Sequence, residues 1–207
     1  MRIAVVTEGS TKVRNAEVVE ALQGFGHELF NLGMKNAPGE PDLTYMETGL
    51  LTALLLNLEA VDFVVGGCGT GQGYMNMVLQ FPGISCGHLC DPVDAFLFAR
   101  VNAGNCVSLA LNKGYGNLGG GLNLHYIFEK LFDSAYGEGY PEARKDIQIN
   151  ARQKLKKLSE QTHRPMTDIL SVIDKSIIKN TLSFPGIREF ICQAPESGLK
   201  ALLLEMS

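Results

Sequence analysis

The sequence lacks the features that would place it in a membrane, on a nucleic acid or in an oxidising compartment. No apolar run reaches the roughly 18 residues that a membrane-spanning helix needs, and residues 1–6 are too short an apolar run for a secretory signal. The net charge is −4, so no chain-wide basic field attracts nucleic acid. The five cysteines are an odd number without disulfide-framework spacing. We therefore expect a cytoplasmic protein with reduced thiols and without membrane or nucleic-acid partners.

Short apolar runs alternate with helical periodicity along the first 136 residues, which predicts α/β units. The expected strands are 3–6, 27–33, 61–66, 84–89 and 106–111, and the expected helices are 13–22, 45–58, 73–80, 92–101 and 122–136. This pattern predicts a three-layer α/β/α fold with a five-stranded parallel sheet. The spacing suits the flavodoxin-like strand order 2-1-3-4-5, with a cleft between strands 1 and 3.

The last third of the sequence changes character. A charged helix is expected over 141–160, another helix over 165–180, a short apolar segment over 187–192 and a final helix near the end. About 60 residues are few for a separate globular domain. We therefore divide the chain into an α/β domain, 1–145, and a helical extension, 146–207, which packs on the core or on a partner subunit.

The 23 glycines cluster at strand ends, most densely after the third expected strand. There Gly67, Gly69, Gly71 and Gly73 enclose Cys68 and Thr70. A strand, a glycine turn and a helix start bring backbone N–H groups together, which favours a bound anion. Cys68 stands at the carboxyl end of the strand, where open α/β sheets bind ligands. Glu8, after the first strand, is expected on the opposite side of the same cleft.

The chemistry of this loop depends on the thiolate of Cys68. A free thiol has a pKa of about 8.5, and clustered N–H groups lower it. The same groups stabilise an oxyanion on a carbonyl compound, and the Thr70 hydroxyl adds a donor. Cys68 is then a nucleophile or a proton-abstracting base. The structural alternative is a glycine turn around a buried cysteine that takes no part in chemistry.

Three other motifs fail on spacing. The dinucleotide pattern G-x-G-x-x-G is not met, because Gln72 and Tyr74 stand where a third glycine is needed. A P-loop requires Lys-Ser/Thr after its glycines, which this chain lacks. The C-x5-R phosphatase motif requires arginine at position 74, where this chain has Tyr74.

The residues Cys86, His88 and Cys90 alternate along the fourth expected strand and could be thought to bind zinc. They spread over about 13 Å of strand, which is too far for one metal ion. We expect neither a metal nor a cofactor.

The loop 67–73 (GCGTGQG), followed by FPGI at 81–84 and Asp91-Pro92, resembles the type B ribose-5-phosphate isomerases and the galactose-6-phosphate isomerase subunits. The resemblance extends from residue 1 to about 144. It implies a cofactor-free aldose–ketose isomerisation, an intramolecular oxidoreduction of carbohydrate (pentose phosphate) metabolism, through a cis-enediolate. In this family the cysteine moves a proton between C1 and C2, and the glycine loop and threonine hold the enediolate oxygen. It also implies a homodimer or homotetramer with sites near the subunit interface.

Several positions depart from the family pattern. An aspartate and a histidine follow the first strand in the family, whereas this chain has Glu8 and Gly9. Val101 stands where the family has the histidine that is credited with ring opening, just before the matching Asn102. Cys90 stands where the family has a further histidine, just before the Asp-Pro.

The phosphate-binding pair of arginines, four residues apart, is Tyr140 and Arg144 in this chain. Half of a bidentate clamp is therefore missing. We expect Glu8 in catalysis and Asn102, Arg144, Tyr140 and Cys90 as substrate contacts, with Arg144 reaching a partner's site. Three of these have a structural alternative: Glu8 could cap its loop, Asn102 could brace a turn, and Arg144 could lie on a solvated helix face.

Taken together, the sequence predicts an aldose–ketose isomerase acting on a sugar phosphate of the ribose-5-phosphate or galactose-6-phosphate type. The departures also allow a different sugar phosphate or a sugar without phosphate. A non-catalytic sugar- or phosphate-binding protein on the same fold is the alternative. A thiol-nucleophile transferase lacks a histidine partner that is evident from the sequence.

Overall fold

The structure, a computed structural model, describes residues 1–113, 120–133 and 135–206. Its centre is one parallel sheet with the strand order β2-β1-β3-β5-β4. The strands are β1 (Arg2–Val6), β2 (Glu28–Asn31), β3 (Phe63–Cys68), β4 (Cys86–Leu89) and β5 (Cys106–Ala110). Every residue of β3 and β5 is buried, as expected of central strands in a parallel sheet that helices cover on both faces.

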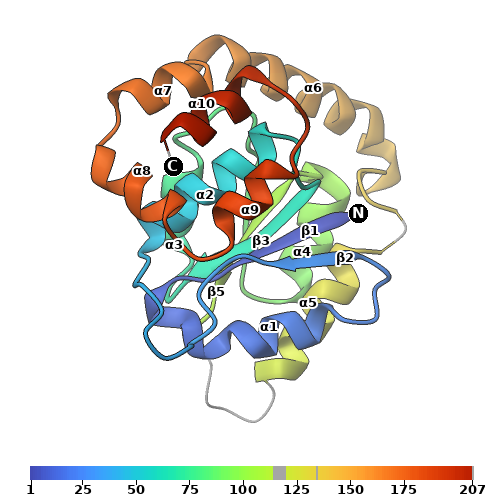
Figure 1. Cartoon of the computed structure of the whole chain (residues 1–207). Helices are drawn as coiled ribbons and strands as arrows, with labels where there is room; N and C mark the ends of the chain where they lie inside the picture. The colour runs from blue at the N-terminus through green and yellow to red at the C-terminus, as the bar shows by residue number, and fades with distance from the viewer. Residues whose placement is uncertain (114–119, 134, 207) are drawn as a thin grey trace.

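Helices lie on both sides of the sheet (Figure 1). On one face, α1 (Asn15–Leu22), α4 (Pro92–Leu97) and α5 (Gly120–Leu131) share an apolar cluster with Val5 and Val65. On the other face, α2 (Tyr45–Asn57) and α3 (Gln72–Val78) pack on Val6 and Val64. The three-layer α/β/α architecture predicted from the alternating pattern is confirmed.

The predicted strand order 2-1-3-4-5 is wrong at one edge of the sheet. β5 lies between β3 and β4, so Cys106 pairs with Val64 on one side and Cys86 on the other. Crossovers between parallel strands are right-handed, so the direction of each step decides which face its helix covers. The step back from β4 to β5 therefore places α4 on the face opposite α3. As a result, the end of β5 lies directly beside the end of β3.

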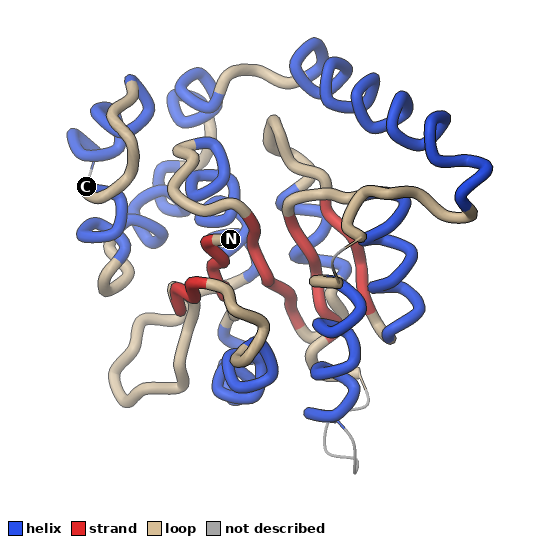
Figure 2. The backbone as a smooth tube through the Cα atoms, turned by 90° about the vertical axis from the view of Figure 1, so that its right-hand side faces the viewer, coloured by secondary structure: helices blue, strands red, loops and turns tan. Residues whose placement is uncertain are grey.

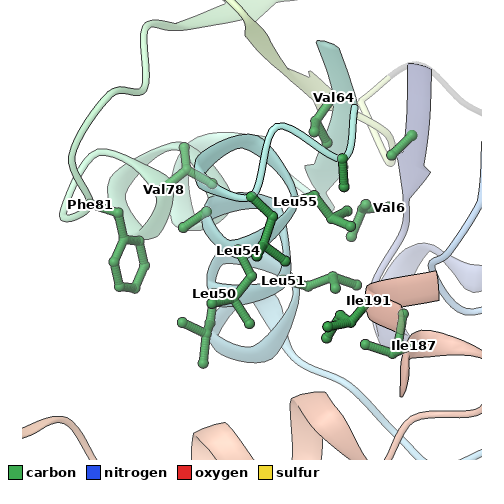
Figure 3. Close-up of a cluster of buried hydrophobic side chains, with 14 of the residues drawn as sticks. Val6, Leu50, Leu51, Leu54, Leu55, Val64, Val78, Phe81, Ile187 and Ile191 are labelled. Atoms are coloured by element: carbon green, nitrogen blue, oxygen red, sulfur yellow. The ribbon is translucent and has the colours of Figure 1, made fainter. Parts of the chain in front are cut away.

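Helix α2 is buried around its whole circumference, including every residue from 47 to 55. Such a helix needs cover on the side away from the sheet, and the C-terminal helices provide it. These helices are α7 (Met166–Val172), α8 (Lys175–Leu182), α9 (Ile187–Cys192) and α10 (Gly198–Met206). Figure 3 shows Leu51 and its neighbours between Val6 of the sheet and Ile191 of α9. One core therefore joins the sheet, α2 and the C-terminal layer.

The single helix expected over 165–180 is two helices. Ile173 is extended, and Asp174 begins α8 by accepting a hydrogen bond from the Ser176 N–H at 2.8 Å. This capping interaction restarts the helix in a new direction. The short apolar segment at 187–192 forms α9, whose Ile187 and Ile191 are buried.

The charged helix α6 (Lys145–Thr162) buries none of its residues. Figure 2 shows it beyond one end of the strands. Arg152 attaches it to the segment before β5 by donating to the Val101 carbonyl (2.9 Å), and to the segment after α5 by donating to the Gly137 carbonyl (2.8 Å). This is the amino edge of the sheet, where the strands begin. None of the helices in the described ranges, α6 included, is long and apolar enough to cross a membrane.

Candidate active site

The glycine loop follows β3 at the carboxyl edge of the sheet, where the parallel strands end. Two of its glycines are required by close approach. A Cβ on Gly67 would lie 2.3 Å from the Leu109 carbonyl oxygen, so a side chain there would separate β3 from β5. Gly71 has a φ of 75°, and a Cβ there would lie 2.5 Å from Nε2 of His88. The loop therefore lies directly on the ends of β5 and β4.

The carbonyl groups of this loop are all bound by protein donors. The Cys68 and Gly69 carbonyls accept from the N–H groups of Leu111 and Asn112, both at 3.0 Å. His88 Nε2 lies 2.9 Å from the Thr70 carbonyl oxygen, and the Ser108 hydroxyl donates to the Gly71 carbonyl. These donors come from β4, from β5 and from the turn after β5.

The loop N–H groups are paired differently. The Gly71 N–H donates to the Cys68 carbonyl at 3.1 Å, and the Gln72 N–H donates to Oγ1 of Thr70 at 3.3 Å. Within the described part of the chain, the N–H groups of Gly69 and Thr70 have no protein acceptor. Two neighbouring unpaired donors at the end of a strand are able to bind an anionic oxygen.

Cys68 and Thr70 lie together at this loop. The Cys68 side chain is 6% exposed, and its sulfur lies 3.9 Å from Oγ1 of Thr70. Cys68 points to the face of the sheet that α2 and α3 cover, in the cluster that includes Val6 and Tyr74. Thr70 is exposed. The thiol is thus at the rim of the core, next to a solvent-facing hydroxyl.

Glu8 lies just after the neighbouring strand β1 and is engaged in its own loop. Its side chain is 6% exposed and accepts from the Ser10 N–H at 3.2 Å and from the Ser10 hydroxyl. It thereby caps the short helix η1 (Gly9–Arg14). The Ser10 carbonyl in turn accepts from Nδ2 of Asn112 at 3.1 Å. The segments after β1, β3 and β5 therefore meet at the carboxyl edge.

Cys90 is brought to the same edge by β4. Its sulfur lies 4.0 Å from Nε2 of His88 and accepts from Nζ of Lys113 at 3.8 Å. Its carbonyl accepts from Nδ2 of Asn123 at 3.1 Å. A thiol, an imidazole and an ammonium group therefore line up beside the glycine loop.

Gly73 lies in the first turn of α3 and allows a further ring to approach. A Cβ there would lie 3.2 Å from Cδ1 of Tyr45, the first residue of α2. The Tyr45 side chain is 43% exposed. An aromatic ring with a free edge thus stands next to the loop.

Sequence reasoning missed several residues that the fold brings to this edge. These are Ser10, Tyr45, His88, Asn112 and Lys113. The signal for Asn112 and Lys113 was present, because polar residues directly after a parallel strand lie at the ligand-binding edge. The sequence places His88 on the fourth expected strand and gives it no metal partner within reach. Nothing in the sequence predicts its contact with Thr70, because that contact depends on the packing of the loop against β4.

Buried polar groups beneath the loop are held neutral. The Tyr74 ring packs against Gly66, and its hydroxyl hydrogen-bonds Oγ1 of Thr52 at 2.6 Å. Burial raises the pKa of Tyr74 well above its usual range. A hydrogen bond with Cys106, together with burial, raises the pKa of the Cys86 thiol. Neither group is therefore suited to act as a base at neutral pH.

The remaining predicted contacts are not brought to Cys68 within one chain. Asn102 is exposed at the end of η2 (Phe98–Asn102), a π-helical turn that precedes β5. Since β5 runs from Cys106 to Ala110, about 13 Å of strand separates its two ends. The Tyr140 ring packs on Phe96 with centroids 5.1 Å apart, and Arg144 is exposed at the end of η3 (Glu142–Arg144). All three belong to the amino edge.

Across residues 1–113, 120–133 and 135–206, no group of three or more His, Cys, Asp or Glu side chains is arranged to hold a metal ion. The five cysteines are free thiols. The carboxyl edge combines a thiol, a hydroxyl and two N–H donors without a protein acceptor in the described residues, groups that suit either proton transfer or nucleophilic attack on a carbonyl compound.

The chain is similar to known sugar isomerases in sequence and in structure. A family model described as ribose/galactose isomerase matches residues 3–132. A solved structure of a 4-deoxy-L-threo-5-hexosulose-uronate ketol-isomerase, complexed with a tartrate, is 39% identical with a TM-score of 0.94, and the match covers 99% of this chain and 98% of that one. A ribose-5-phosphate isomerase from Vibrio parahaemolyticus is 37% identical with a TM-score of 0.92, again over 99% and 98%.

A shorter relative shares only the fold. The type B ribose 5-phosphate isomerase of Leishmania infantum is 17% identical, with a TM-score of 0.61 over 77% of this chain and 97% of that one. The two full-length matches thus include the C-terminal helices. The comparison with curated proteins gives no match.

Proposed function

This chain belongs to the ribose/galactose isomerase family, and we propose that it is an aldose–ketose isomerase acting on a sugar phosphate through a cis-enediolate. The observation that carries the proposal is the position of the Cys68 thiol, next to the Thr70 hydroxyl and directly before the N–H groups of Gly69 and Thr70, which have no protein acceptor in the described residues. A base beside an anion-binding loop is what an enediolate reaction requires.

In the proposed reaction, the Cys68 thiolate removes the proton from C2 of the open-chain aldose. The electron pair of the broken C–H bond forms the C1–C2 double bond, and the C1 carbonyl oxygen becomes negatively charged. The N–H groups of Gly69 and Thr70 and the Thr70 hydroxyl stabilise this oxygen. The Cys68 thiol then returns the proton to C1, and the hydroxyl proton of O2 moves to O1, which leaves the ketose.

The other residues of the carboxyl edge are assigned to substrate contact. Glu8 hydrogen-bonds a sugar hydroxyl and assists the transfer of the O2 proton, because its carboxylate lies in the segment next to the loop. Cys90 contacts the substrate from β4, beside Lys113. The remaining glycines, Gly67, Gly71 and Gly73, allow the backbone and the substrate to approach closely.

Asn102, Tyr140 and Arg144 are assigned to the site of a second copy of the chain. They lie at the amino edge, about 13 Å of strand away from the loop, so they complete the site only across a subunit interface. We therefore propose a homodimer or homotetramer, with Arg144 of one copy binding the anionic group of the substrate in its partner's site. We place this enzyme in the cytoplasm, in keeping with its free thiols.

A sugar acid is the second candidate substrate. The full-length relative at 39% identity is a uronate ketol-isomerase, crystallised with a tartrate. Only Arg144 remains of the expected pair of arginines, and a single guanidinium suffices for a carboxylate. A uronate-type substrate would undergo the same proton transfer at Cys68.

The test is to incubate the purified enzyme in D2O with ribose 5-phosphate, galactose 6-phosphate and 4-deoxy-L-threo-5-hexosulose uronate. We expect conversion of one of them, with deuterium appearing on the carbon that receives the proton. Mass spectrometry of the protein during turnover should show no covalent adduct on Cys68. Failure of all three substrates to convert would contradict the proposal, and binding without exchange would favour a sugar-binding protein.

A further inference from the structure

His88 has no role in the reaction proposed above, although it contacts the glycine loop directly. Its Nε2 lies 2.9 Å from the Thr70 carbonyl oxygen, and a carbonyl only accepts, so Nε2–H is the donor. The ring also lies against Gly71, where a Cβ would be 2.5 Å from Nε2. His88 is the residue of β4 that reaches across to the end of β3.

The direction of a peptide carbonyl fixes the direction of its N–H, because the two are antiparallel in a planar trans peptide. The Cys68 and Gly69 carbonyls are held by the backbone after β5, which turns the N–H groups of Gly69 and Thr70 away from β5. The next peptide is held at both ends, by His88 at the Thr70 carbonyl and by Cys68 at the Gly71 N–H. Without His88, the Thr70 carbonyl would lose its protein donor.

We propose that His88 is a positioning residue of the isomerase site, which rests on the function proposed above. Its Nε2–H holds the Thr70 carbonyl and thereby fixes the backbone of Thr70, so that the Thr70 hydroxyl stays directed at the enediolate oxygen beside the N–H groups of Gly69 and Thr70. A donor displaced by about 1 Å costs on the order of 100-fold in rate. The imidazole does this as a hydrogen-bond donor and transfers no proton to the substrate.

Two variants separate the hydrogen bond from the imidazole. In His88→Gln, the side-chain amide places an N–H donor close to the position of Nε2, whereas His88→Leu keeps the bulk and removes the donor. His125→Leu is the matched control, because His125 is exposed and lies against Phe25 on the other face of the sheet. Urea denaturation of all variants checks folding, and His88→Asn replaces His88→Leu if the latter does not fold.

Two measurements are made on each variant: kcat and KM with the converted sugar, and the rate of amide hydrogen exchange at Gly71. For His88→Leu we expect kcat to fall by about 10–100-fold with KM changed less than about 3-fold, and Gly71 to exchange at least about 10-fold faster. For His88→Gln and His125→Leu we expect both quantities to stay within about 5-fold of wild type.

An unchanged kcat in His88→Leu overturns the proposal. Equal losses in His88→Leu and His88→Gln also overturn it, because the imidazole itself would then be needed. Unchanged exchange at Gly71 in His88→Leu shows that the loop is held by other contacts. If the wild type converts no sugar, the proposed function fails, while the exchange measurement still decides whether His88 holds the loop.

Discussion

The two edges of the sheet use their polar groups in opposite ways. At the carboxyl edge, side chains and backbone bind the carbonyls of the glycine loop and leave the N–H groups of Gly69 and Thr70 without a protein acceptor in the described residues. At the amino edge, arginine side chains form contacts within the protein. Arg152 donates to two backbone carbonyls, and Arg100 forms an ion pair with Asp133 at 2.8 Å. The carboxyl edge therefore offers free donors to a ligand, whereas the amino edge uses these arginines to brace the structure.

Arg144 is a cation at the amino edge that is not used in this way. It is exposed, and it has no ion-pair partner among the described residues. A cation without an ion-pair partner is available to a ligand. In this chain, however, Arg144 lies at the amino edge, and the glycine loop with Cys68 lies at the carboxyl edge. This contrast is why the proposed site requires a second copy.

The largest effect should come from removing the base at the carboxyl edge. We expect Cys68→Ala to lower kcat by about 1,000-fold or more, because general acid–base catalysis contributes about 10²–10⁴. Turnover and deuterium incorporation measure the loss. Cys192→Ser, which alters an exposed thiol on α9, is the control and should leave both unchanged. A Cys68→Ala variant with normal turnover would remove the carboxyl edge from the chemistry.

The next effect tests whether the two edges meet between copies. Arg144→Ala should raise KM by about 10-fold or more, because a charge-assisted hydrogen bond is worth about 1.5–3 kcal/mol. Its kcat should change less than its KM.

Mixing Cys68→Ala and Arg144→Ala chains, followed by unfolding and refolding together, sharpens this test. If Cys68 and Arg144 of one site come from different copies, each mixed dimer contains one intact site, and activity at low substrate concentration should exceed that of either variant alone. Activity no higher than the average of the two variants would place both residues in one chain's site or exclude Arg144.

The bracing role of the amino edge predicts a loss of stability without a loss of activity. Arg152→Ala removes the donors of the Val101 and Gly137 carbonyls, and we expect the free energy of unfolding to fall by about 1–3 kcal/mol. Urea denaturation measures this, and kcat should be unchanged. Lys154→Ala, on the exposed side of α6, is the control, for which about 0.5 kcal/mol or less is expected. A large fall in kcat without destabilisation would contradict the assignment.

The smallest effect concerns acid stability at the start of α2. Glu47 is buried, which by itself would raise its pKa, but hydrogen bonds from the side chain and N–H of Thr44 and from Asn180 outweigh burial and lower it. Because the folded pKa lies below the unfolded value of about 4.3, this stabilisation is present at neutral pH. It is lost as the pH falls through the folded pKa.

Glu47→Gln should therefore unfold more easily at pH 7, by about 1 kcal/mol, with a smaller difference from wild type near pH 3. Urea denaturation at the two pH values measures it. Glu160→Gln on α6 is the control and should match the wild type at both. A difference that grows on acidification would reverse the sign of the argument.

Much of the carboxyl edge could be predicted from the sequence. Residues 61–66 indicated a buried strand, and the glycines around Cys68 and Thr70 indicated a tight loop at its end. The apolar helical spacing of residues 45–58 indicated a helix, which α2 confirms. The family resemblance was confirmed as well. These features are local, because periodicity and glycine content report how a segment relates to its immediate surroundings.

What the sequence did not decide are the relations between distant segments. The exchange of β4 and β5, the contact of His88 with Thr70 and the distance of Arg144 from Cys68 all depend on which strand lies beside which. Neighbouring positions in the sheet are chosen by crossover direction and by the packing of helices on each face, and no local pattern records them. The sequence by itself therefore determined the reactive loop, and the tertiary structure decided which side chains surround it.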